Sequence, residues 1–157
     1  MDLSSFFAIF AAGVSAVLIG WIWYLPAVFG TAWMRMAGVT PEMAERGKKR
    51  MPLMAFIGLL AAMVVAYVMS YVSLAWGFYD WIGALELGFW CWVGFIAPTM
   101  LGMVLWEQKP FKLYLINVLY WLVALLVMAQ IIVLSTSLSS GAYVTPDDNG
   151  DYYIVGE

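Results

Sequence analysis

The sequence predicts an all-α membrane protein in which four transmembrane helices form one bundle. Apolar residues make up 65% of the 157 residues and charged residues 11%, whereas an average soluble domain carries about 25% charged residues. The apolar residues gather in four stretches, each close to the roughly 20 residues that a helix needs to cross a bilayer. These predicted spans are residues 3–25, 51–74, 81–104 and 111–134.

The basic residues predict the orientation of the chain. All seven lysines and arginines fall between spans one and two or between spans three and four. Because positively charged connections are retained in the cytoplasm, we expect both connections to be cytoplasmic and both termini extracytoplasmic. The expected location is the plasma membrane, which is the inner membrane in a bacterium. The first span is not expected to be a cleaved signal, since Asp2 and no basic residue precede it.

The connection after span one predicts a short amphipathic helix at the membrane interface. Pro26 ends the span, and Phe29, Trp33 and Met36 then recur at helical spacing, with Arg35 on the opposite side. Such a segment is suited to lie in the headgroup layer. Gly38 is expected to end it.

A second brief helix is predicted before span two. Thr40 offers an N-cap hydroxyl and Pro41 suits the first helical position, and we expect this helix to run to about Arg46 and to end at Gly47. The basic run that follows is predicted to anchor the topology and to contact anionic lipid headgroups. Its residues are Lys48, Lys49 and Arg50.

The tail after span four, residues 135–157, is expected to be an acidic extracytoplasmic segment outside the transmembrane domain of residues 1–134. Ala142–Thr145 and Tyr152–Val155 favour strands, and Asn149 and Gly150 between them form a strong turn signal. The tail is therefore predicted to be either a small β-hairpin or a flexible end.

Small residues recur at every fourth position in three spans, which places them on one helix face and lets two backbones approach closely. We interpret these rows as packing seams within the bundle, or in part as seams that face a neighbouring protomer. The residues are Ala8, Ala12, Ala16 and Gly20 in span one, Gly58, Ala62, Ala66 and Ser70 in span two, and Gly94, Pro98 and Gly102 in span three.

Polar residues inside or beside the spans are the candidate functional residues, because they are costly in lipid. Glu86 enters span three near its outer end, and Asn117 and Gln130 lie in span four. Glu107 lies at the cytoplasmic rim near Lys109 and Lys112, where we expect an ion pair. For each of these polar residues a structural role is the alternative.

The sequence predicts no catalytic chemistry. It contains no histidine and a single cysteine, Cys91 in span three, and it has no nucleophile–base arrangement, phosphate loop or cluster of metal ligands. We therefore expect no enzyme activity, metal or cofactor. The net charge of −3 also argues against nucleic-acid binding, which requires a basic surface.

Two segments carry motifs of aromatic residues, prolines and glycines. The first consists of Trp23, Tyr24, Pro26, Phe29, Gly30 and Trp33, and the second of Pro98, Thr99, Trp106, Glu107, Lys109, Pro110, Asn117, Tyr120 and Trp121. With these motifs the chain resembles, over about residues 14–134, the bacterial membrane family called domain of unknown function 1761. Leu25 departs from the small polar residue often found before the first motif's proline. The resemblance implies a four-span bundle and supplies no activity.

Three classes of function remain open. The first is a small membrane protein that associates with itself, or that serves as a structural or accessory subunit of a larger membrane assembly. The second is an oligomeric channel or small-solute transporter that uses Glu86 and Asn117, because four helices rarely enclose a pore alone. The third is a lipid-binding protein or an intramembrane enzyme.

Overall fold

A computed structural model describes residues 3–139, 143–146 and 152–155 of the chain. Within this part, four helices are long and apolar enough to cross a membrane, with bounds Leu3–Trp23, Pro41–Trp76, Trp81–Leu105 and Phe111–Ser137. The predicted fold class is confirmed: the chain is an all-α, multi-pass membrane protein.

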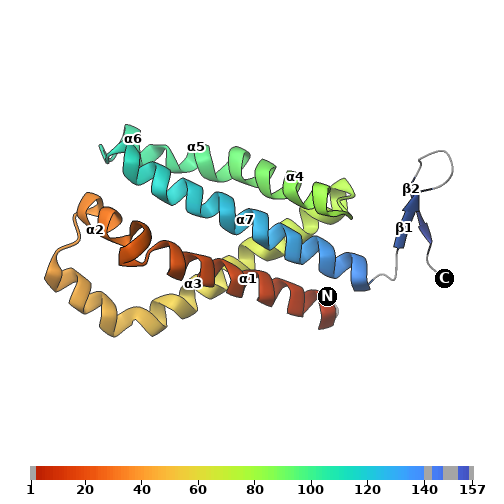
Figure 1. The fold of residues 1–157 in the computed structure, drawn as a ribbon, viewed down its shortest axis with the longest axis horizontal. Helices are drawn as coiled ribbons and strands as arrows, with labels where there is room; N and C mark the ends of the chain where they lie inside the picture. Colours follow the sequence, from red (N-terminus) through yellow and green to blue (C-terminus); the bar gives the residue numbers. More distant parts are fainter. Residues whose placement is uncertain (1–2, 140–142, 147–151, 156–157) are drawn as a thin grey trace.

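Helix α7 (Phe111–Ser139) lies at the centre of the bundle, between α1 (Leu3–Trp23) and the interrupted third span (Figure 1). Of its most apolar stretch 39% is buried, against 11% in span three. Helix α3 (Pro41–Trp76) crosses α1 and touches the third span mainly near the turn that joins them. We call the end with the α1–α3 and α6–α7 connections the basic end, because all seven lysines and arginines lie there.

The first connection begins with a π-helical turn, η1 (Pro26–Gly30), and continues into helix α2 (Thr31–Ala37). Gly38 ends α2 in the left-handed conformation with φ of 74°, which a glycine adopts without steric cost. The predicted short helix and its end are thereby confirmed.

The prediction that a separate helix ends at Gly47 is wrong. Helix α3 is capped by Thr40, whose hydroxyl accepts a hydrogen bond from the amide of Met43 at 3.3 Å, and it then continues without a break to Trp76. A single glycine costs a helix only about 1 kcal/mol, and the helix runs through it. Pro52 lies inside α3, and the helix changes direction in its orange-to-yellow part (Figure 1), as proline-containing helices do.

The third span is divided into several pieces rather than bent at one point. Helix α4 (Trp81–Cys91) is followed by a second π-helical turn, η2 (Trp92–Ile96), and then by α5 (Ala97–Met100) and α6 (Gly102–Leu105). Pro98 lies at the start of α5, where its missing amide removes no hydrogen bond that the helix requires. The widened turn before it therefore accommodates the proline.

The last helix extends beyond the predicted boundary at residue 134. The hydroxyl of Thr136 donates to the carbonyl of Ile132 at 3.0 Å, and the hydroxyl of Ser137 lies within hydrogen-bonding distance of the carbonyls of Val133 and Tyr79, at 3.0 and 2.7 Å. Hydroxyls that bond to the preceding turn of their own helix let the helix continue. Further on, β1 (Tyr143–Pro146) and β2 (Tyr152–Val155) pair antiparallel, with Tyr143 opposite Val155. The predicted turn at Asn149 and Gly150 lies outside the described residues.

Candidate functional site

Asn117 of α7 is the centre of a hydrogen-bonded group at the basic end. Its Oδ1 accepts a hydrogen bond from the hydroxyl of Tyr24 at 2.8 Å and another from the indole Nε1 of Trp33 at 3.1 Å. Tyr24 follows α1 and Trp33 belongs to α2, so one side chain of the last span holds two segments of the first connection. Because an indole N–H only donates, the amide must turn its oxygen toward Trp33.

Two further aromatic side chains extend this group to backbone acceptors. The indole of Trp23 donates to the carbonyl of Ile116 at 3.1 Å, and the hydroxyl of Tyr120 donates to the carbonyl of Ala16 at 3.2 Å. The rings are also in contact: the centroid of Tyr24 lies 5.5 Å from that of Trp33 and 5.6 Å from that of Tyr120. We call these five residues the Asn117 cluster: Trp23, Tyr24, Trp33, Asn117 and Tyr120.

The turn η1 brings Trp33 back over Tyr24. The amide of Gly30 donates to the carbonyl of Leu25 at 2.9 Å, and a Cβ at Gly30 would overlap the carbonyl oxygen of Tyr24. The hydroxyl of Thr31 donates to the carbonyl of Pro26 at 3.0 Å. Only glycine fits this close approach of the backbone to itself, so the turn depends on it.

The Asn117 cluster joins the end of α1 and the first connection to α7. The hydroxyl and indole donors of its described residues are directed at Asn117 or at backbone carbonyls. Such interhelical hydrogen bonds contribute about 0.6–2 kcal/mol each in a membrane.

Helix α7 also takes part in further side-chain hydrogen bonds that join it to the third span, as donor or as acceptor. The indole of Trp92 donates to the carbonyl of Val118 at 2.8 Å, and the hydroxyl of Tyr114 donates to that of Ala97 at 3.1 Å. At the opposite end, the amide of Gln130 donates to the carbonyl of Trp81 at 2.9 Å. Gln130 thus ties α7 to the first turn of α4.

Glu86 lies apart from these contacts. It is exposed on α4, and within the described residues it makes no hydrogen bond or ion pair. With a rise of about 1.5 Å per residue, Glu86 lies about 8 Å inward from Trp81, whereas Asn117 lies about 20 Å inward from Gln130, which contacts Trp81. Glu86 and Asn117 are therefore about 12 Å apart in depth and do not form one site within the chain.

The ion pair expected for Glu107 is not formed. Glu107 is exposed in the turn between α6 and α7, and the ion pair found in the described residues joins Lys48 to Glu45 at 2.7 Å. The turn is shaped instead by Gln108, which has φ of 54° and whose side-chain amide donates to the carbonyl of Leu105. This positive φ directs the chain into α7 and separates Glu107 from Lys109 and Lys112.

The small residues of the first two spans lie mostly where helices meet. Ala12, Ala16 and Ala66 are at most 1% exposed, and a Cβ at Gly20 would lie 3.2 Å from the ring of Tyr120. Ala8 and Ala62 are also buried, and Ser70 donates to the carbonyl of Tyr67 within α3.

The row predicted for span three does not lie between helices of this chain. A Cβ at Gly94 would meet no heavy atom within 4 Å, and the same holds for Gly58 in α3. Pro98 and Thr99 are exposed and Gly102 is half-buried. In place of this row, α4 packs on α7 through Ala84 and Gly88. Ala84 is fully buried, and Gly88 is so close to α7 that an added Cβ would lie 2.9 Å from the Cα of Leu126. Ala84 and Gly88 are also four residues apart, but they belong to a different row from Gly94, Pro98 and Gly102.

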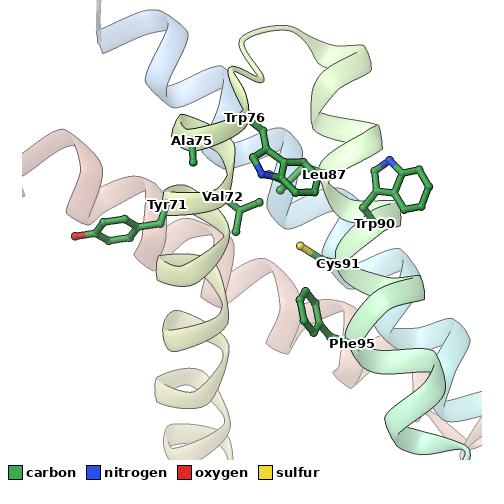
Figure 2. A pocket seen from close by; sticks show the side chains of 8 residues that line it. All are labelled: Tyr71, Val72, Ala75, Trp76, Leu87, Trp90, Cys91 and Phe95. Carbon is green, nitrogen blue, oxygen red and sulfur yellow. The ribbon is translucent and has the colours of Figure 1, made fainter.

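An apolar pocket of about 340 Å³ lies between α3 and α4, on the side away from α7 (Figure 2). Val72 of α3 faces Cys91 and Phe95 across it, and Trp76 lies near its top. Cys91 is the chain's single cysteine and is half-buried in this wall. No charged side chain lines the pocket, so it suits an apolar occupant.

Comparison with known proteins gives one match. A family model described as "Protein of unknown function (DUF1761)" aligns with residues 7–133, which include both motifs and the whole Asn117 cluster. No curated protein and no solved structure matches the chain. Because the aligned region covers more than half of the chain and contains all four spans apart from a few terminal residues, the protein belongs to the DUF1761 family.

Proposed function

We propose that the protein is a structural, self-associating protomer of a membrane assembly, and that it associates through the face formed by α3, α4 and η2. Its orientation in this proposal follows the charges, with the basic end in the cytoplasm. The other end and the tail carry seven acidic residues and no basic residue: Asp2, Asp80, Glu86, Asp147, Asp148, Asp151 and Glu157.

The observation that carries the proposal is a glycine open to the outside of the bundle beside an apolar pocket. Gly94 has free space where a Cβ would project, and the next residue, Phe95, lines the pocket and is 69% exposed. An exposed glycine in a membrane helix gains nothing from lipid, but it allows a second helix to approach its backbone closely. The pocket beside it can then receive a bulky side chain of the second copy.

The row of small residues in the first span does not support an interface there. Ala12 and Ala16 are already buried against neighbouring helices of the same chain, so replacing them would disturb the protomer rather than a contact between protomers. The interface is therefore assigned to span three.

The test is Gly94→Leu. Since the protomer has room for the added side chain, it should fold normally and lose its self-association. Light scattering after size-exclusion chromatography in mild detergent should show an oligomer for the unmodified protein and a smaller species for the variant. The matched control is Ala11→Leu on the exposed side of α1, which should leave the oligomer unchanged. An oligomer of the same size in Gly94→Leu would refute the proposed interface.

Transport by an oligomer is the second candidate, and Glu86 is the observation that favours it. A carboxylate on the outer surface of α4 that has no partner among the described residues is costly in lipid, and association of two copies could place it in a shared polar space. In that case Glu86→Gln would abolish cation flux into liposomes while oligomer size stayed the same. Flux that is absent from the unmodified protein would remove this candidate.

A further inference from the structure

A second apolar groove, of about 220 Å³, lies between α1 and α3 toward the basic end. Its walls are Val14, Val17 and Leu18 of α1 and Ala55, Phe56 and Leu59 of α3. It is separate from the pocket between α3 and α4, and it plays no part in the proposed self-association.

The groove begins where α1 and α3 cease to be in direct contact. At the crossing, a Cβ on Gly13 would lie 2.8 Å from Cγ of Met63 and 3.3 Å from Cδ1 of Leu59. From this crossing toward the basic end, the side chains of the two helices leave the groove open between them. Within the described residues, no side-chain hydrogen bond joins α3 to α1.

The depth of the groove matches the acyl region beneath a headgroup. Leu18 lies five residues before Trp23 at the end of α1, and Ala55 lies five residues after Arg50, the last basic residue of α3, so each is about 8 Å along its helix from these two residues. Val14 and Leu59 are both nine residues from the same two residues, or about 14 Å. Both walls therefore place the groove at the same depth in the membrane, where lipid acyl chains lie rather than water.

The charges above the groove are positive. Lys48 and Lys49 precede Ala55 and Phe56 by seven residues, or two turns, and so lie on the same face of α3 as these two wall residues. Lys48 is paired with Glu45 at 2.7 Å. Lys49 has no acidic partner within the described residues.

From this arrangement we infer that the protein binds a phospholipid with a net negative headgroup in the leaflet at the basic end. One acyl chain lies in the groove between α1 and α3, and the headgroup phosphate lies against Lys49. The apolar walls select a lipid chain, and the cation above them selects the charge of its headgroup.

The test compares Lys49→Gln with Arg50→Gln, which remove the same charge from adjacent positions about 100° apart around α3. The full chain is placed in nanodiscs of equal parts phosphatidylglycerol and phosphatidylcholine, and the lipids that remain bound are counted by native mass spectrometry. Lys49→Gln should lower the preference for phosphatidylglycerol about fivefold, the effect expected for one interfacial charge. Arg50→Gln, whose row leads away from the groove to Ile57, should lower it less than twofold.

The groove itself is tested by filling it. Ala55→Trp should abolish the retained phosphatidylglycerol, whereas Ala11→Trp on the exposed side of α1 should not. Equal losses in Lys49→Gln and Arg50→Gln would overturn the inference, because they would indicate general surface attraction, and so would unchanged retention in Ala55→Trp. Oligomer size is measured on the same samples, so that a loss of lipid binding can be distinguished from a loss of the proposed self-association.

Discussion

Helices α7 and α3 both cross the membrane, but they are held in the bundle by different forces. Helix α7 takes part in hydrogen bonds with the first connection, with α1, and with the start and the middle of the third span. In the described residues α3 has no side-chain hydrogen bond to another helix, and its contacts with α1 rest on small residues such as Ala62 and Ala66. The pocket and the groove both lie along α3.

The difference shows which part of the molecule is available to other molecules. In lipid, polar bonds add to close backbone contacts in fixing one helix to another, and in the described residues the interhelical polar bonds converge on α7. The helix that lacks polar bonds is also the one whose two sides remain open. The proposed protein and lipid contacts therefore both use α3, while α7 provides the frame.

The largest effect is expected where α4 touches α7. In Gly88→Leu, the new side chain would meet the backbone of Leu125 and Leu126, whose nearest atoms lie 2.9–3.1 Å from the added Cβ. Backbone cannot move aside as a side chain can, so the variant should lose about 3 kcal/mol or more of unfolding free energy. Unfolding in mixed micelles, followed by tryptophan fluorescence, would measure this loss.

The control is Gly58→Leu on α3, where a Cβ meets nothing within 4 Å. This variant should unfold within about 0.5 kcal/mol of the unmodified protein. Similar losses at both glycines would contradict the contrast between the two helices.

A smaller effect is expected when Asn117 becomes leucine, a side chain of similar size. The hydroxyl of Tyr24 and the indole of Trp33 would lose their shared acceptor, and two interhelical bonds in a membrane amount to about 1–3 kcal/mol. The same micelle unfolding would measure the loss, and limited proteolysis should cut the first connection sooner because α2 would no longer be held to α7.

The stability loss in Asn117→Leu is compared with the loss of one hydrogen bond, that of Gln130 to the carbonyl of Trp81. Gln130→Leu should cost about 0.6 kcal/mol, and the first connection should remain protected. If Asn117→Leu cost no more than Gln130→Leu, the Asn117 cluster would not be the main attachment of the connection.

Much of the fold could be predicted because hydropathy and charge act locally. The four spans, the stop at Gly38 and the cap at Thr40 all depend on residues that are near one another in the sequence. The prediction that a helix ends at Gly47 was wrong because it considered the glycine alone. Its neighbours are good helix formers, and the continuous α3 that contains it is packed against α1 further along.

The candidate site was predicted only in part. Asn117 is conspicuous as a polar residue in an apolar span, but its partners Tyr24 and Trp33 precede it by 93 and 84 residues. No periodicity in one sequence connects positions so far apart. These partners were identified through the family motifs, which mark them without stating what they contact.

Helix α3 has 36 residues and is therefore about 54 Å long, whereas the hydrocarbon core is about 30 Å thick. Its charged first turns thus stand in water while its remainder lies in lipid, and one unbroken backbone joins the two. A soluble molecule that bound these first turns would therefore contact the same helix that forms one wall of the groove between α1 and α3, with Pro52 between the two parts.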